Sequence, residues 1–233
     1  MMKKPFYNNL LGDGKIIGDY YKNDPFHSEK RQFVLDEVGK GKVVLDVGCN
    51  EGFIGGKLIK NKNVVYGIDI VNRNLIKAKS KGMIVSNVDI DRDKLPYRDN
   101  FFDVVVLADF IEHVFDTDAV LRKCAKVLKK NGKLIITTPN IASLGRRMML
   151  LLGMSPFTEH SLELSTSGLP AAGHIRYYTV PTLKEQLEYD GFENVKIRGN
   201  AVNFITFRSR FLGKIFPSLS VTLTAIAHKK NKN

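Results

Sequence analysis

The chain has 233 residues, of which 43% are hydrophobic and 26% are charged, a composition typical of one globular domain and unlike that of a low-complexity protein. Its net charge of +12 would suit nucleic acid, an anionic membrane surface or an anionic substrate, but no arginine-aromatic block marks a recognition surface, so we disfavour nucleic acid and read the charge as solvated basic faces. No apolar run approaches a membrane-spanning length and the first ten residues lack the apolar core of a secretory signal, so we expect a cytoplasmic protein.

Strand and helix patterns alternate along the chain. Apolar spacing predicts helices over 24–38, 72–80 and 118–130, the last capped by Asp116 or Thr117 and stopped by the Asn131-Gly132 pair, and a final helix opened by Thr182. Short apolar runs predict strands. This alternation predicts a parallel sheet with helical crossovers, closed by two strands that no helical period separates and that are therefore antiparallel. The predicted strands cover 42–47, 63–70, 83–88, 101–109, 133–139, 192–199 and 220–229.

A glycine loop, residues 48–52, joins the first strand to a helix. A dinucleotide site needs glycine where Asn50 stands, so that the pyrophosphate can approach the backbone, and no G-K-S or G-K-T is present to hold nucleotide phosphates. Asp69 ends the second strand, from which a carboxylate can take both ribose hydroxyls. The loop therefore favours an adenosine compound without phosphates, and an NAD-dependent oxidoreductase remains the alternative.

Four segments, LDVGCNEG, GIDI, LPYRDNFFDVVVLADFIEHV and KVLKKNGKLIITTPN, resemble in order and spacing the successive motifs of class I S-adenosylmethionine-dependent methyltransferases. The resemblance covers about residues 30–140. It implies a Rossmann-like α/β fold, a seven-stranded and mostly parallel sheet with helices on both faces and a reversed last strand. We expect one domain over 1–233, with a cofactor-binding core over 24–140, a lid or acceptor insertion over 141–175, and a C-terminal helix and antiparallel strand pair over 176–233.

The resemblance also implies roles for the residues that match its motifs, with S-adenosylmethionine as the cofactor. The glycine loop and Asp69 would hold the methionine portion and the ribose. Asp89 would meet the adenine amine, although counting back from LPY selects Asp91 instead. The implied cofactor-binding residues are Asp46, Gly48, Asn50, Gly52, Asp69, Ile70, Asp89, Ile90, Ala108 and Asp109.

Asp109, Glu112 and His113 would share one face of a helix, and they offer two ways to activate an oxygen acceptor. His113 could act as a general base oriented by a carboxylate. Alternatively the three side chains could bind a divalent cation such as magnesium or calcium, since the segment is similar to the E-x-x-E-H of quinone-biosynthesis O-methyltransferases, with Asp109 in place of the first glutamate. A third interpretation is that Glu112 and His113 serve only hydrogen bonding and packing. His174, in GHIRYYT, is a second catalytic candidate, and His160 a weaker one.

Residues 141–157 carry apolar side chains at helical spacing beside Arg146 and Arg147. The simplest interpretation is a lid helix that packs on the sheet; an adaptable apolar acceptor pocket and transient contact with a membrane surface are the alternatives. The predicted partner is a small-molecule acceptor, methylated on the oxygen of a phenol, a sugar or a lipid-linked compound. An RNA methyltransferase and a non-catalytic S-adenosylmethionine-binding module remain alternatives, and the sequence predicts no oligomeric state.

Overall fold

The computed structural model describes residues 25–157, 173–204 and 207–231. Its main sheet has seven strands in the order β3-β2-β1-β4-β5-β9-β6. Strands β1, β2 and β3 pair in parallel, whereas β9 is antiparallel to both of its neighbours. These pairings confirm the predicted seven-stranded, mostly parallel sheet with a reversed last strand.

The chain divides into two compact units. The first contains the described residues up to Val106 together with Lys126–Gly132. Its strands follow the apolar runs, because four of the five residues of β1 are buried, as expected for a strand covered on both faces. Its elements are α3 (Pro25–Val38), β1 (Val43–Val47), α4 (Gly55–Lys60), β2 (Val64–Asp69), α5 (Asn72–Ser80), β3 (Ile84–Asn87) and most of β4 (Phe102–Ala108).

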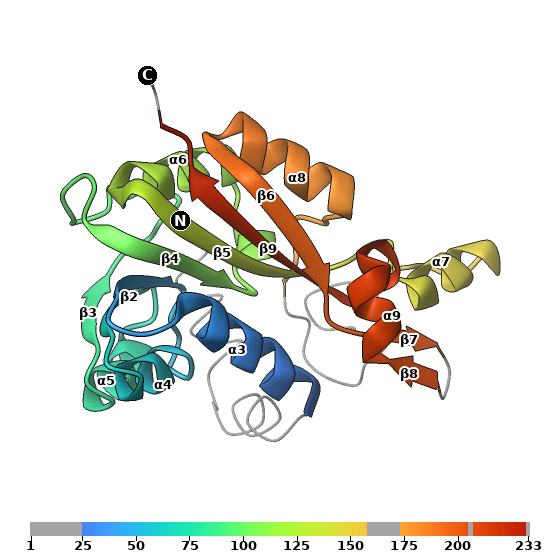
Figure 1. Ribbon diagram of the computed structural model, residues 1–233, viewed down its shortest axis with the longest axis horizontal. Helices are drawn as coiled ribbons and strands as arrows, with labels where there is room; N and C mark the ends of the chain where they lie inside the picture. The colour runs from blue at the N-terminus through green and yellow to red at the C-terminus, as the bar shows by residue number, and fades with distance from the viewer. Residues whose placement is uncertain (1–24, 158–172, 205–206, 232–233) are drawn as a thin grey trace. The chain divides into compact units, whose positions relative to one another are not determined.

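The second unit contains Leu107–Ala125 and the described residues from Lys133 onward. Helix α8 contacts β6 (Figure 1), and β6 and β9 form the antiparallel pair that the sequence predicts. A separate two-stranded sheet, β7-β8, lies in this unit. The remaining elements are η1 (Ile111–His113), α6 (Thr117–Val127), β5 (Leu128–Pro139), α7 (Leu144–Leu151), α8 (Val180–Tyr189), β6 (Phe192–Gly199), β7 (Val202–Phe204), β8 (Phe207–Ser209), α9 (Arg210–Ile215), η2 (Pro217–Leu219) and β9 (Thr222–Lys229), with α6 and β5 partly in the first unit.

The start of helix α6 was predicted correctly and its end was not. Asp116 caps it, because its Oδ1 accepts the Ala119 N–H at 2.9 Å. The helix ends at Val127, however, and strand β5 already begins at Leu128, so the predicted helical end over 128–130 is wrong. Asn131 takes a φ of 59° within the strand, so the Asn-Gly pair bends a strand instead of stopping a helix.

Two further predictions in the second unit are wrong. The helix expected to open at Thr182 begins at Val180 and is capped by Thr179, and it is not the final one, because β7, β8 and α9 follow before β9. The helix at 141–157 is shorter than expected. It does not pack on the main sheet: within α7, all of whose residues are described, none is buried, and the helix contacts β7. Among the described helices none is long and apolar enough to cross a membrane.

Candidate functional site

Left-handed backbone shapes the loop after β1. Gly48, Asn50 and Gly52 have φ values of 69°, 48° and 73°. Gly48 and Cys49 donate their N–H groups to the Ile68 carbonyl at 2.9 and 3.0 Å, which ties the loop to the end of β2. Asparagine is one of the few non-glycine residues that adopt this conformation readily. The turn therefore forms with a side chain at its centre, as the sequence predicts.

Asp69 fixes the loop from the end of β2. One carboxylate oxygen accepts the N–H of Asn50 at 2.9 Å and the other accepts that of Val71 at 2.8 Å. Burial raises the pKa of Asp69, and these backbone hydrogen bonds oppose the rise. Each carboxylate oxygen can accept more than one hydrogen bond, so the same group that organises the loop can also receive ligand hydroxyls.

Asp46, in β1, is only 3% exposed. Burial, together with the charge of nearby Asp69, raises its pKa to about 7, while a hydrogen bond from the Gly55 backbone opposes the shift. Two neighbouring carboxyl groups, one buried and one partly exposed, disfavour double ionisation. A cationic group placed beside them would stabilise both as carboxylates.

Packing explains part of the glycine pattern without any ligand. A Cβ on Gly52 would lie 2.7 Å from Met83 Sδ and 3.0 Å from Ala78 Cα, and Gly55 and Gly67 also face Met83 closely. Gly52 is thus needed for its positive φ and for the approach of α5 and Met83. The glycines alone are weak evidence for a ligand, and the polar groups of Asp46, Asn50 and Asp69 carry more of the argument.

Asp89 and Ile90 lie in the turn after β3. The Asp89 carboxylate accepts the Asp91 N–H at 3.2 Å and lies 3.8 Å from Arg92 Nε, so it caps its own turn. Ile90 is buried, whereas Ile70, after β2, is partly exposed. Asp91 is also partly exposed, and the choice between Asp89 and Asp91 as the adenine contact stays a prediction.

Ala108 ends β4, and Asp109 turns the chain away from the strand with a φ of 50°. Thr137 of β5 holds this turn: its carbonyl accepts the Asp109 N–H at 2.9 Å, and its hydroxyl donates to Asp109 Oδ1 at 3.1 Å. The next residues form η1, which is one turn of 3-10 helix. Asp109 therefore does not share a helical face with Glu112 and His113, and that prediction is wrong. The left-handed turn at the end of β4 places the Asp109 side chain beside Thr137 of β5.

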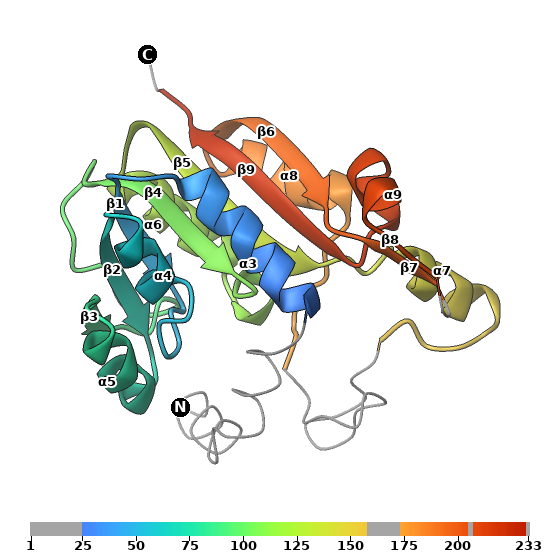
Figure 2. The ribbon, with the colours of Figure 1, turned by 60° about the horizontal axis from the view of Figure 1, so that its bottom comes forward.

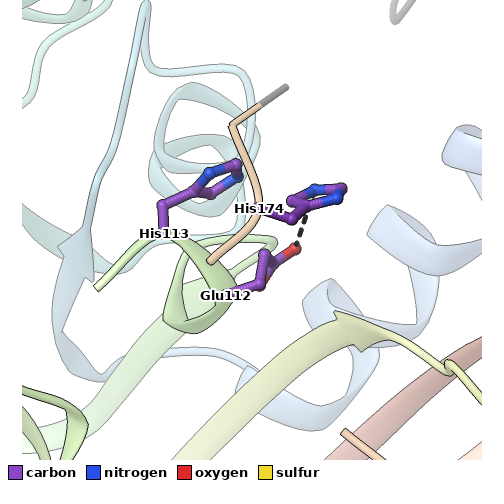
Figure 3. A group of neighbouring side chains, drawn as sticks. All are labelled: Glu112, His113 and His174. Carbon is purple, nitrogen blue, oxygen red and sulfur yellow. Dashed lines mark ion pairs between the residues drawn. The ribbon is translucent and has the colours of Figure 1, made fainter. Parts of the chain in front are cut away.

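His174 takes the place expected for Asp109. The ligand atoms of Glu112, His113 and His174 all lie within 4.8 Å of one another (Figure 3). The Glu112 carboxylate, 1% exposed, points toward His174 with Oε1 4.0 Å from Nε2, and the two imidazole rings lie 4.8 Å apart. We call these three residues the Glu-His-His group.

Backbone contacts bring His174 to the end of β4. The Glu112 carbonyl accepts the N–H groups of Ile175 and Arg176 at 2.9 and 3.1 Å, and His113 Nδ1 lies 3.3 Å from the Gly173 carbonyl. If the His113 ring donates to that carbonyl, its Nε2 carries the lone pair. No sequence pattern pairs Glu112 with His174, and the only signal was the histidine itself among aromatic residues. His160 lies outside the described residues.

Known proteins resemble this chain in sequence. Residues 21–197 match a family model described as a methyltransferase domain. The chain is 33% identical over 107 residues to a ubiquinone biosynthesis O-methyltransferase of Neisseria meningitidis, and 32% identical over 106 residues to one of Coxiella burnetii. Each alignment covers 43% of this chain and 45% of the relative, so the chain spans less than half the length of these relatives.

Solved structures match over a larger share of the chain. A possible histamine N-methyltransferase of Thermotoga maritima superposes with a TM-score of 0.70 at 17% identity, covering 97% of this chain and 99% of its own. A 1,6-didemethyltoxoflavin-N1-methyltransferase of Burkholderia thailandensis, solved with S-adenosylhomocysteine, gives 0.62 at 16% identity, covering 98% and 87%. At such identities the likeness establishes the fold alone.

Proposed function

The chain belongs to the class I S-adenosylmethionine-dependent methyltransferase family, and from that premise we propose that it transfers a methyl group to an oxygen of a small-molecule acceptor. S-adenosylmethionine would donate the methyl group from its sulfonium, and S-adenosylhomocysteine would be released. The names of the O-methyltransferase relatives support an oxygen acceptor, and a phenol is the first candidate.

The first unit supports the cofactor assignment through its polar groups. Asp69 presents a carboxylate whose two oxygens are already oriented by Asn50 and Val71, which suits two neighbouring ribose hydroxyls. Asp46, with its raised pKa, suits the ammonium group of the methionine portion, because a cation would favour the ionised carboxyl. The side chain of Asn50 occupies the place where a pyrophosphate would need bare backbone.

The remaining cofactor contacts are carried over from the family motifs. Asp89 would meet the adenine amine with Ile70 and Ile90 beside the ring, and Ala108 and Asp109 would line the methyl end. Of these, Ile90 is a buried apolar residue suited to an adenine face. Because Asp89 also caps its own turn, we expect its substitution to disturb the loop as well as adenine binding.

The observation that carries the proposal is the pair of hydrogen bonds that orient the Asp69 carboxylate, one from the Asn50 N–H of the glycine loop and one from the Val71 N–H. Isothermal calorimetry with S-adenosylmethionine, S-adenosylhomocysteine and NADH tests it directly. We expect heat with the first two and none with NADH. Binding of NADH alone would instead support the oxidoreductase alternative, and S-adenosylhomocysteine binding without turnover on a broad acceptor panel would support a non-catalytic module.

Oxygen methylation requires the acceptor hydroxyl to lose a proton, and the Glu-His-His group can serve that step as a base. A proton on His113 Nδ1, held by the Gly173 carbonyl, leaves Nε2 as the acceptor of a proton. The Glu112 carboxylate, with Oε1 4.0 Å from His174 Nε2, would orient the His174 ring. In this arrangement His113 is the base and His174 a positioning residue.

A bound cation is the second candidate, favoured by the close approach of the three ligand atoms. Two imidazoles and one carboxylate suit zinc or another first-row transition metal better than the magnesium or calcium expected when Asp109 was counted as a ligand. When bound, such an ion would polarise the acceptor oxygen.

Three variants separate these interpretations. His113→Ala and His174→Ala should each lower turnover, with S-adenosylhomocysteine affinity kept. If the group works as a base, chelation leaves turnover unchanged and His113→Ala shifts the pH profile more than His174→Ala. If it binds a cation, chelation abolishes turnover, and Glu112→Gln lowers the metal content of the purified protein. Full turnover in both histidine variants would restrict the group to a structural role.

A further inference from the structure

One end of the second unit exposes an unusual number of large apolar side chains. They come from α7 and the turn after it, from β8, and from α9 and the residue that follows. Leu151 and Phe211 are 75% and 70% exposed. We call this region the α7–α9 surface; its exposed apolar residues are Leu150, Leu151, Leu152, Met154, Phe207, Phe211, Ile215 and Phe216.

These elements lie side by side within the unit. Helix α7 and helix α9 both contact β7, and β7 pairs with β8 in a regular antiparallel register (Figures 1 and 2). Arg147 of α7 also donates to the Ser218 carbonyl of η2 at 3.2 Å. The exposed apolar residues therefore gather around one small two-stranded sheet, and they are not scattered singly.

The exposure is built into the local structure. At the end of α7 the Met154 N–H bonds the Met149 carbonyl at 2.8 Å and the Gly153 N–H bonds the Leu150 carbonyl at 3.0 Å, with a φ of 73° at Gly153. This is a Schellman motif, which closes a helix firmly. Arg146 further bonds the Pro156 carbonyl at 2.9 Å, so the apolar turn is held in place.

Helix α9 is fixed in the same way. Ser209 caps it by accepting the Leu212 N–H at 3.2 Å. Its inner side is Gly213, where an added Cβ would lie 2.7 Å from Ala201 Cα. Since Gly213 is buried and Phe211 is exposed, the helix turns its smallest residue inward and leaves its aromatic side chain in solvent.

The charged residues described on this surface are basic. Arg147, Arg208, Arg210 and Lys214 are exposed beside the apolar residues. Neither residues 141–157 nor residues 194–231 contain any aspartate or glutamate. Among the described residues of this surface, cations flank the exposed apolar side chains, and this composition suits the headgroup region of an anionic bilayer.

We propose that the α7–α9 surface docks this protein on an anionic membrane surface. A second copy of the chain would bring the same cations, and a net charge of +12, against each other, whereas an anionic bilayer complements both the charge and the apolar side chains. Contiguous exposed apolar surface on a folded unit marks an interaction site, and the charge selects which one.

Phe157, three residues after Met154 of this surface, contacts the segment that carries His174. The Phe157 and Tyr177 rings are in contact at 4.7 Å, and the Tyr177 hydroxyl donates to the His174 carbonyl at 3.3 Å. If the proposed function holds, the acceptor is an amphiphile held in the bilayer, and its hydroxyl end reaches the Glu-His-His group. This step rests on the proposed function. The docking itself requires no methyl transfer.

Flotation of the full chain with phosphatidylcholine vesicles, with and without phosphatidylglycerol, tests the docking. We expect binding only to the anionic vesicles, weakened by salt. Leu151→Gln should lower the bound-to-free ratio on the order of tenfold, because one leucine side chain no longer inserts into the bilayer. Arg210→Gln combined with Lys214→Gln should lower it by about fivefold per cation removed.

Matched controls remove the same chemistry elsewhere. Ile76, 70% exposed on α5, is the control for Leu151, and Lys57 with Lys60 on α4 is the control for the charge pair. Control variants should float like the wild type. The proposal is overturned if the wild type does not float, if controls and test variants lose equal binding, or if light scattering shows a dimer that Leu151→Gln dissociates. Calorimetry with S-adenosylhomocysteine, done without vesicles, reports separately on the proposed function.

Discussion

Replacing Asp46 by asparagine should stabilise the free protein at pH 8. Burial of the Asp46 carboxyl, together with the charge of Asp69, raises its pKa from 3.8, the value of an unperturbed aspartate, to about 7. The folded protein therefore holds a proton that the unfolded chain releases, so stability declines as the pH rises from about 4 to about 7. A difference of about three pKa units corresponds to about 4 kcal/mol. Asparagine avoids this penalty because it never ionises.

Urea unfolding at pH 5 and pH 8 measures the effect. We expect the free energy of unfolding of Asp46→Asn to exceed that of the wild type by about 2 to 4 kcal/mol at pH 8, and by much less at pH 5. Asp69→Asn is the informative companion, because removing the neighbouring charge should bring the Asp46 pKa down and flatten the same pH dependence. A gap of equal size at both pH values would refute the electrostatic reasoning. The stabilised Asp46→Asn variant should also bind S-adenosylmethionine more weakly, as expected for a strained functional carboxyl.

Three further predictions concern Gly52, with Gly41 as its control, Asp69 and Asp103. Gly52→Ala should cost about 2 to 4 kcal/mol, and Gly41→Ala, with a similar φ of 68° but nothing within 4 Å, about 1 kcal/mol; equal losses in urea unfolding would mean that contact with Met83 is unimportant. Asp69→Asn should weaken S-adenosylhomocysteine binding at least about tenfold by calorimetry, and unchanged affinity would remove it from the ribose site. In Asp103, the Lys129 and Val43 hydrogen bonds outweigh burial and lower the pKa. Its stabilisation is therefore fully present above about pH 4 and is lost as the pH falls through the lowered pKa, so the cost of Asp103→Asn, about 1 kcal/mol at pH 7, should be smaller at pH 3; a constant cost would contradict this.

Local patterns were sufficient to predict most of the sheet. Strand 192–199 and helix 72–80 have the predicted limits, because the apolar pattern of each stops clearly at both ends. The end of α6 was mispredicted because Leu128–Lys130 continues the helical period while tertiary contacts make it a strand, with the Phe101 N–H bonded to the Val127 carbonyl at 2.7 Å. Elements β7, β8 and α9 have only three to six residues each, which is too short for a periodic signal.

The site divides in the same way. The glycine loop and Asp69 are local features, and their hydrogen bonds could be expected from the strand ends. The Glu-His-His group could not, because Glu112 and His174 are far apart in the chain and meet through backbone contacts that no side-chain pattern encodes. Asp109 was misplaced for a local reason, the left-handed turn after β4, which the helical reading of the segment overlooked.

Glu112 does two separate jobs, since its carbonyl receives the N–H groups of Ile175 and Arg176 while its carboxylate faces His174. Hydrogen exchange at those two amides therefore reports whether the histidine is in place, independently of any chemistry. If a side-chain change at Glu112 leaves both amides protected, any loss of turnover arises in an assembled site, whereas fast exchange would show that the segment with His174 had separated from Glu112.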